Sequence, residues 1–303
     1  MPMDSSLAAS DVFPDTRQFL SWKKQKLDGY GSEYTNPPVN IADPFRIRED
    51  EYARLIEQVR RRNFVLYRLD PEYSESPQAI MALCQQLGLT TTIGNPESGQ
   101  DHISYIYDRS QDIESPSRYI PYTSKPLNWH TDGYYYPENH KVHSFVMHCA
   151  HQAESGGENS LIDHEMLYIQ MQELAPELIQ CLCLPDTLTI PENAEQGKIL
   201  RETFQGPVYS MDNNGCLYMR FTQRRHHIIW KQSAKVTQAI TLLNSMLSSP
   251  LPWKVTMRLA RGEGMLCNNI LHCRHAYSDS YPKIPKRLLY RIRFNERIVP
   301  DYP

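Results

Sequence analysis

The sequence lacks long apolar runs and any clustering of charge of one sign. No apolar run approaches the roughly 20 residues that a membrane-spanning helix needs, and the first residues have no basic segment followed by an apolar stretch. The 32 Lys and Arg are spread along the chain against 35 Asp and Glu, which gives a formal net charge of −3. Membrane insertion, secretion and nucleic-acid binding are therefore disfavoured, and we expect a cytoplasmic protein whose partner is a small molecule.

The sequence also lacks a cysteine framework and internal repetition. Its seven cysteines are odd in number and form no paired C-x-x-C motif, which disfavours a disulfide scaffold and a structural zinc site. No repeat or low-complexity tract is present, which excludes solenoids and propellers. What is present is a globular composition, with 40% hydrophobic and 22% charged residues, in a chain long enough to enclose a buried site as a monomer or a homo-oligomer.

The chain changes character near residue 45. Residues 1–45 are rich in Pro and Ser and weakly periodic, which predicts an irregular N-terminal arm, and residues 46–303 are predicted to form one domain. Within that domain, apolar residues recur at helical spacing over 49–62, and the run 63–69 (NFVLYRL) alternates like a strand. A second helix is predicted over 77–87.

From Ser104 onward the sequence consists of short strand-like runs broken by turn-rich segments. The runs are SYIYD, HSFVMHCA, PVYSM, CLYMRF, WKVTMRL, MLCNN and LLYRIRF. This pattern predicts a mainly β fold with flanking helices, of the sandwich or jelly-roll kind. Apolar spacing predicts helical insertions over 164–182 and 233–247.

A histidine and a carboxylate stand two residues apart in NWHTD, as His130 and Asp132. On an extended chain, residues i and i+2 point to the same face, so both side chains can reach one ion. Two histidines and one carboxylate on one side of a metal suit Fe(II) and leave coordination positions open. The candidates for the third ligand are His272 and His275, directly after the strand-like run MLCNN.

Three segments resemble, in order along the chain, the taurine dioxygenase (TauD/TfdA) family of the clavaminate synthase-like superfamily. They are NWHTDGYYYP, GGEN and LHCRHAYSD followed by KRLLYRIRF, and they span residues 128–294. The resemblance implies a double-stranded β-helix (jelly-roll) core that works with iron(II), 2-oxoglutarate and dioxygen and releases succinate and carbon dioxide. It also implies that iron is bound by His130, Asp132 and, as the His that opens an H-G-R-like tripeptide, His272; Cys273 replaces the Gly of that tripeptide.

The arginines of KRLLYRIRF match a second family pattern, R-x-x-x-R. The resemblance implies that Arg287, the first of them, meets the far carboxylate of 2-oxoglutarate, and that Arg291, the second, holds an acidic group of the substrate. A planar guanidinium suits a buried carboxylate because it can donate two parallel hydrogen bonds. Arg293 shares their face of the predicted strand, has no partner in the pattern, and is compatible with an exposed position.

Further site residues are predicted beside these motifs. In GGEN, Asn159 stands where the family has a Thr that helps to hold 2-oxoglutarate, so the resemblance implies a co-substrate contact through Asn159 or through the neighbouring Ser160. Tyr134 and Tyr135, directly after Asp132, either line the substrate mouth or pack beneath a loop. Turn-rich segments over 110–127 and 185–206 are predicted to carry substrate selectivity.

The residues and the resemblance together predict an iron(II)- and 2-oxoglutarate-dependent dioxygenase that oxidises, by hydroxylation, a C–H bond of a small acidic molecule. The retained Asp132 favours hydroxylation or a related oxidation over halogenation, because halogenases of the same fold replace this carboxylate with a small residue. Two alternatives remain open: a zinc-dependent hydrolase with the same ligands, which would give no role to Arg287, and a catalytically silent jelly-roll protein that binds a small acid.

Overall fold

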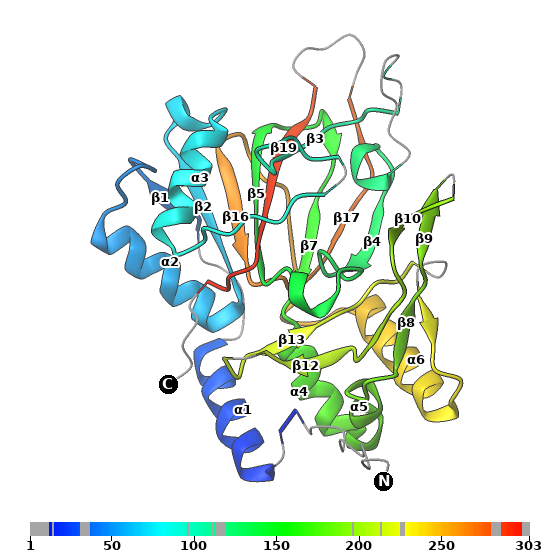
Figure 1. The fold of residues 1–303 in the computed structure, drawn as a ribbon. Helices are drawn as coiled ribbons and strands as arrows, with labels where there is room; N and C mark the ends of the chain where they lie inside the picture. Colours follow the sequence, from blue (N-terminus) through cyan, green and yellow to red (C-terminus); the bar gives the residue numbers. More distant parts are fainter. Residues whose placement is uncertain are drawn as a thin grey trace. The chain divides into compact units, whose positions relative to one another are not determined.

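The computed structural model describes residues 12–13, 15–30, 37–95, 97–110, 112, 119–195, 197–212, 214–224, 228–279 and 286–298. The chain divides into two compact units (Figure 1). The first comprises the described residues within 33–163 and 253–303, and the second those within 1–32 and 164–252. Each unit is described by itself. None of the helices in these described ranges is long and apolar enough to cross a membrane.

The first unit is built on two sheets. The larger has the strand order β1-β2-β16-β5-β19-β3, and its strands are Val39–Ile41 (β1), Phe64–Leu69 (β2), Glu263–Cys267 (β16), Ser144–His151 (β5), Leu288–Phe294 (β19) and Ser104–Ile106 (β3). The smaller has the order β15-β7-β17-β4, with strands Val255–Met257 (β15), Asn159–Ile162 (β7), Leu271–Arg274 (β17) and Leu127–His130 (β4). A two-stranded pair joins Tyr277–Ser278 (β18) to Ser155–Gly156 (β6). All of these pairings are antiparallel except that of β1 with β2.

One hydrophobic core lies between the two sheets of this unit. It joins Phe145 and Met265 of the larger sheet to Leu161 of the smaller sheet, all of them fully buried. A second core lies on the opposite face of the larger sheet, where the helices Glu49–Arg62 (α2) and Pro77–Gln86 (α3) pack (Figure 1). Three short 3-10 helices, Pro71–Tyr73 (η1), Ile120–Tyr122 (η2) and Glu138–His140 (η3), lie in the connections.

The strand β19 alternates between these two cores. Tyr290, Ile292 and Phe294 belong to the core beneath the helices, whereas Leu289 belongs to the core between the sheets. The predicted alternation of KRLLYRIRF is therefore confirmed, and its arginines share the face of Leu289. The sheet thus directs several guanidinium groups toward the space between the two sheets.

The helix α2 begins and ends where its sequence indicates. The backbone N–H of Arg48 donates to the Glu51 side chain at 2.9 Å, and three acidic residues occupy the first turn, where they complement the helix dipole. At the other end Asn63 adopts a left-handed conformation with φ of 60° and donates its N–H to Val59. Residues 49–62 were predicted as this helix.

His148 of β5 lies in the core beneath the helices, fully buried. Its Nδ1 lies 3.1 Å from the Tyr67 hydroxyl and its Nε2 lies 3.0 Å from the carbonyl oxygen of Ser74, so one neutral tautomer satisfies both contacts. Burial lowers the pKa of His148 to about 4. The imidazole is therefore a neutral structural group at pH 7.

We expect His148 to make the protein less stable in mild acid. The unfolded chain would bind a proton near pH 6.5, and the folded chain only near pH 4, so stability is complete above pH 6.5 and falls as the pH drops toward 4. The loss could reach about 3 kcal/mol. Urea unfolding of His148→Gln across this window should show a smaller decrease in the free energy of unfolding than wild type, whereas His140→Gln, at an exposed position, should match wild type. Equal decreases in wild type and His148→Gln would contradict this.

The second unit contains four helices and a set of short strands in its described residues. The helices are Thr16–Tyr30 (α1), His164–Leu174 (α4), Pro176–Leu182 (α5) and Ala234–Ser248 (α6). The strands are Leu188–Ile190 (β8), Asn193–Glu195 (β9), Lys198–Arg201 (β10), Phe204–Gly206 (β11), Tyr209–Met211 (β12), Leu217–Met219 (β13) and Ile229–Trp230 (β14). The helix α1 packs on α4 through the rings of Phe19, Trp22 and Tyr168 and through a buried ion pair of 2.6 Å between Lys26 and Glu165.

The structure corrects three details of the sequence predictions. The stretch 1–45 is not wholly irregular, because α1 and β1 lie within it. The helix predicted over 164–182 is two helices, since Pro176 disfavours a helical conformation at Ala175, which has φ of −159°. The segment 185–206, predicted from its turn residues to be a loop, contains β8 to β11, while most of 111–118 in the other predicted loop lies outside the described residues. The strand-rich fold with flanking helices is confirmed as a mixed helix and sheet structure, and the single domain from residue 46 onward stays a prediction.

Candidate metal and co-substrate site

Two histidines meet across neighbouring strands of the smaller sheet. His130 ends β4, and His272 lies directly opposite it on β17 in the antiparallel register. Residues opposite each other on adjacent strands point their side chains to the same face, which brings residues far apart in the sequence together. The two rings lie 4.2 Å apart between centroids, and Phe145 packs against the His272 ring.

Asp132 reaches the same place from the turn that follows β4. The turn depends on Gly133, which has φ of 64° and where an added Cβ would lie 2.5 Å from the Val142 side chain. Asn269, in the connection between β16 and β17, fixes the backbone of Asp132. Its side chain accepts from the Asp132 N–H at 2.7 Å and donates to the Asp132 carbonyl at 2.9 Å.

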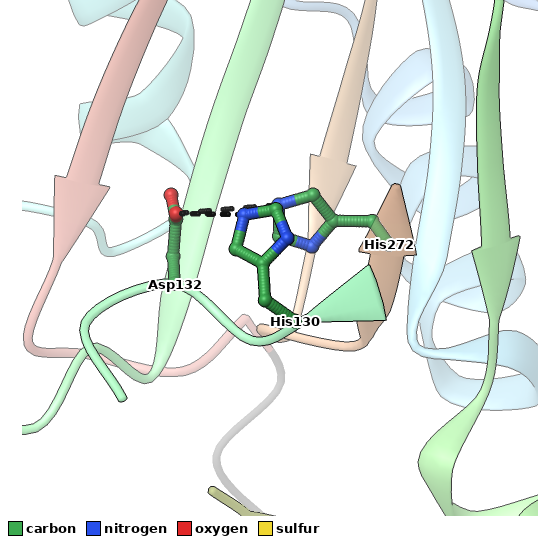
Figure 2. Close-up of side chains that lie close together, drawn as sticks. All are labelled: His130, Asp132 and His272. Atoms are coloured by element: carbon green, nitrogen blue, oxygen red, sulfur yellow. Dashed lines mark ion pairs between the residues drawn. The ribbon is translucent and has the colours of Figure 1, made fainter. Parts of the chain in front are cut away.

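The three side chains point toward one another, as Figure 2 shows. One potential ligand atom from each lies within 4.8 Å of the other two, and all three residues are buried. Asp132 Oδ1 is 3.8 Å from His130 Nε2 and 4.0 Å from His272 Nε2. The Nδ1 atoms of the two rings lie 2.8 Å and 3.0 Å from backbone carbonyl oxygens, which favours the tautomer that leaves each Nε2 able to bind a metal.

The charges around the three side chains favour the protonation states in which they can bind a metal. Burial by itself would raise the pKa of the Asp132 carboxyl, but Arg291 and Arg293 outweigh it and hold that pKa well below its usual range. Burial also lowers the pKa of His272 despite the opposing effect of Asp132. The group therefore presents an ionised carboxylate and a neutral imidazole, which are the protonation states that bind a divalent metal.

Both arginines beside Asp132 are buried and contact it directly. Arg291 Nη1 lies 3.3 Å from Asp132 Oδ1. Arg293 donates through Nε to Oδ2 at 2.9 Å and through Nη2 to Oδ1 at 3.0 Å. The sequence pattern was compatible with an exposed Arg293 side chain. This interpretation is wrong, because the second sheet encloses the strand face that carries Arg293.

Arg287, which directly precedes β19, lies apart from this pair and has a buried N–H donor without an acceptor among the described residues. Its guanidinium stacks over the Tyr277 ring, 4.5 Å from the centroid. Arg287 Nη1 and the Tyr277 hydroxyl are both buried without a hydrogen-bond partner in the described residues. Gly157, with φ of 79°, permits this packing, since an added Cβ there would lie 3.3 Å from Arg287 Nε and 3.4 Å from Tyr277 Cβ.

The structure also separates Asn159 from Ser160. Asn159 is buried and lines the same small cavity as Arg287, together with Gly156 and Gly157. Ser160 follows it on the strand and so faces the other way, where its hydroxyl lies 2.8 Å from Thr256 and 3.3 Å from His275. Of these two side chains, only that of Asn159 therefore faces the cavity in which Arg287 could bind a small molecule.

The remaining predicted residues divide between site and periphery. Tyr135 borders the site because Arg293 Nη1 donates to its hydroxyl at 3.2 Å, and Tyr134 is buried with its ring edge-to-face against Tyr135. His275 is exposed and lies outside the metal-binding group. Cys273 occupies the strand face opposite His272, so the replacement of the family's Gly does not narrow the space between the three ligands.

Sequence reasoning missed several residues that build the site. Asn269 lies in no family motif, and Tyr277, although it stands within LHCRHAYSD, was assigned no role; the roles of both depend on backbone conformation and cross-strand packing. Arg274 was interpreted only as part of the tripeptide. Its buried guanidinium donates to the carbonyl oxygens of Pro121, Thr123 and Lys125 and so connects β17 to the segment that precedes β4. The sequence offered no signal for that role beyond an arginine two residues after a predicted ligand, because the burial of Arg274 is visible only in the structure.

The arrangement can bind a divalent metal on one face and a dicarboxylate beside it. Two imidazoles and one carboxylate leave coordination positions for other ligands. In the described part of the chain, Asp132 is the only carboxylate in an ion pair with any of the buried guanidiniums of Arg274, Arg287, Arg291 and Arg293. This excess of buried positive charge favours anionic ligands.

Comparisons with known proteins agree with this chemistry. A sequence model described as "Taurine catabolism dioxygenase TauD, TfdA family" matches residues 23–293. A uridine-5'-phosphate dioxygenase from Amycolatopsis sp is 26% identical over 267 residues, which cover 80% of this chain and 87% of that protein.

Solved structures share the fold. An asparagine oxygenase, in complex with Fe(II), 2S,3S-3-hydroxyasparagine and succinate, has a TM-score of 0.56 at 14% identity and covers 81% of this chain and 79% of its own. The non-haem iron oxygenase OrfP, with Fe and alpha-ketoglutaric acid, has a TM-score of 0.56 at 17% identity, with coverage of 83% and 81%. A taurine dioxygenase from Burkholderia xenovorans has a TM-score of 0.54 at 15% identity, with coverage of 85% and 89%. Since the family's sequence model matches most of the chain, the protein belongs to the TauD/TfdA family of non-haem iron, 2-oxoglutarate-dependent dioxygenases.

Proposed function

We propose that this dioxygenase binds Fe(II) through His130 Nε2, His272 Nε2 and one carboxylate oxygen of Asp132, within a double-stranded β-helix core formed by the two sheets of the first unit. The observation that carries the proposal is the convergence of three buried potential ligand atoms within 4.8 Å of one another. When bound, iron and 2-oxoglutarate would supply the activation of dioxygen, with succinate and carbon dioxide as products. The protein's own residues orient the ligands, exclude water and present the substrate.

We further propose that Arg287 binds the far carboxylate of 2-oxoglutarate, with Asn159 and Tyr277 as additional donors. The support is a pair of buried donors without acceptors among the described residues, Arg287 Nη1 and the Tyr277 hydroxyl, beside a cavity that Arg287 and Asn159 line. Burial raises the pKa of Tyr277, so its hydroxyl remains protonated and can donate. A carboxylate with two oxygens can accept from both groups, which removes the cost of burying them unpaired.

The substrate is proposed to be a small molecule with an acidic group, bound by Arg291 and walled by Tyr134 and Tyr135. Arg291 Nε is buried without a partner in the described residues, and Asp132 shares its negative charge between Arg291 and Arg293. The named substrate of the Amycolatopsis relative, uridine 5'-phosphate, carries such a group. Two arginines against one carboxylate leave positive charge for a second anion beside the metal.

Replacing Arg291 with alanine should therefore raise the KM of an acidic substrate by about tenfold or more, while 2-oxoglutarate decarboxylation without substrate persists. The measurement is succinate release over a library of acidic and neutral small molecules, with uridine 5'-phosphate among the acids. Arg261→Ala, at an exposed arginine, is the control. Stimulation by neutral or cationic compounds alone would contradict the proposal, as would unchanged kinetics in Arg291→Ala.

A further inference from the structure

Arg293 contacts both oxygens of the Asp132 carboxylate. Nε donates to Oδ2 at 2.9 Å and Nη2 donates to Oδ1 at 3.0 Å, and both residues are almost fully buried. Charge-assisted pairs of this two-point kind fix orientation as well as distance. The neighbouring Arg291 differs, because it makes a single contact, of 3.3 Å, to Oδ1.

The two carboxylate oxygens consequently have different surroundings. Oδ1 faces the imidazoles, at 3.8 Å from His130 Nε2 and 4.0 Å from His272 Nε2. Oδ1 also accepts from Arg293 Nη2 and lies 3.3 Å from Arg291 Nη1, whereas Oδ2 accepts from the Nε–H of Arg293. The torsion that interchanges such oxygens is normally soft, but here it is restrained from two sides, since Asn269 fixes the Asp132 backbone and Arg293 fixes its oxygens.

The number of oxygens that Asp132 gives to a metal determines how many positions remain. A carboxylate can bind a metal through one oxygen or through both. A second oxygen would take a position that 2-oxoglutarate, which needs two, or dioxygen would otherwise occupy. A donor on Oδ2 competes with this second bond.

We infer that Arg293 is a positioning residue that keeps Asp132 a one-oxygen ligand and so preserves the open coordination positions of the metal. The inference rests on the proposed metal site. Arg293 is itself positioned, because β19 is paired on both sides, with β5 and β3, and because Arg293 Nη1 donates to the Tyr135 hydroxyl at 3.2 Å. Its two adjacent N–H groups are the feature that matters, and lysine, with a single ammonium group, lacks them.

The test separates metal binding from co-substrate binding. Apo wild type, Arg293→Lys and Arg297→Lys are titrated anaerobically with Fe(II), and then with 2-oxoglutarate while the visible absorption of the complex is recorded. Arg297 is the matched control, since it is a buried arginine that bonds to Asn63 away from the three ligands. We expect Arg293→Lys to bind Fe(II) within about threefold of wild type but 2-oxoglutarate at least tenfold more weakly.

Other outcomes would overturn the inference in distinguishable ways. Unchanged 2-oxoglutarate binding in Arg293→Lys would show that Arg293 is not needed to keep the second Asp132 oxygen from the metal. Equal losses of affinity for Fe(II) and for 2-oxoglutarate would show that Arg293 supports the site as a whole instead. If wild type forms no complex, the proposed metal site fails and the inference fails with it. Should Arg293→Lys not fold, Tyr135→Phe is measured in its place, because it removes only the hydroxyl that positions Arg293. Tyr135→Phe should weaken 2-oxoglutarate binding about threefold and leave Fe(II) binding unchanged. No change in 2-oxoglutarate binding would contradict the inference.

Discussion

Replacing His272 with alanine should abolish turnover and reduce Fe(II) binding by a factor of 100 or more, on the order of the loss expected when a metal site loses one of three protein ligands. The physical reason is the cross-strand geometry: His272 lies opposite His130, and no other described histidine, cysteine or carboxylate joins the group with His130 and Asp132. The measurement is metal content after anaerobic loading, together with 2-oxoglutarate decarboxylation. His130→Ala and Asp132→Ala should behave in the same way.

His275→Ala is the control for this prediction. His275 stands three residues further along, is exposed, and contacts Ser160 at 3.3 Å on the other strand face. Its replacement should leave iron content and turnover close to wild type. Full iron-dependent activity in His272→Ala with loss of activity in His275→Ala would show that the distal ligand has been assigned to the wrong histidine.

Replacing Arg287 with alanine should weaken 2-oxoglutarate binding by at least about 30-fold, which corresponds to the lower end of the roughly 2 to 5 kcal/mol lost with a buried charge-assisted pair. Fe(II) binding should be unaffected, because Arg287 contacts none of the three metal ligands in the structure. Anaerobic titration of the Fe(II)-loaded variant with 2-oxoglutarate gives the dissociation constant. An unchanged constant would move the anchor elsewhere, with Arg291 as the next candidate.

Tyr277→Phe refines this test, because it removes only the hydroxyl and leaves the ring on which Arg287 stacks. It should weaken 2-oxoglutarate binding by about tenfold, the cost of one hydrogen bond to a charged group. Tyr290→Phe is the matched control, since the Tyr290 hydroxyl donates to the Glu75 carbonyl and its ring belongs to the other core. Equal effects of the two variants would argue against a specific role for Tyr277.

The sequence predicted those parts of the fold in which local pattern and tertiary packing agree. The helix over 49–62 has acidic residues in its first turn, an apolar stripe and a terminal Asn, and the structure begins and ends it at the same residues. The strand over 288–294 has strict alternation because each of its faces meets a different core. The helix α1 was missed because its stability depends on aromatic contacts and a buried ion pair with α4, which its own periodicity does not reveal.

The same division applies to the site. The spacing of His130 and Asp132 indicated a shared face, and the structure does bring them together with His272. Neither Arg293 nor Asn269 could be assigned from spacing, because their partner, Asp132, is more than a hundred residues away and is reached only through the sheet register. Long-range pairing of this kind depends on topology and not on any local motif.

The two alternative functions, a zinc-dependent hydrolase and a silent acid-binding protein, each leave one feature of the site without a purpose. A zinc-dependent hydrolase would need a metal-bound water and no buried guanidinium with free donors. A silent acid-binding protein would need no complete and correctly protonated ligand group. Membership of the dioxygenase family and the orphaned donors of Arg287 and Tyr277 both favour an enzyme that takes 2-oxoglutarate.

A crystal structure of the protein grown anaerobically with Fe(II) and 2-oxoglutarate, with the metal located by anomalous scattering at the iron edge, is the most direct test of the central claim. We predict one iron in contact with His130 Nε2, His272 Nε2 and Oδ1 of Asp132 alone, and 2-oxoglutarate with its far carboxylate on Arg287. Iron bound elsewhere, a metal bond to His275, or a co-substrate carboxylate away from Arg287 would contradict it.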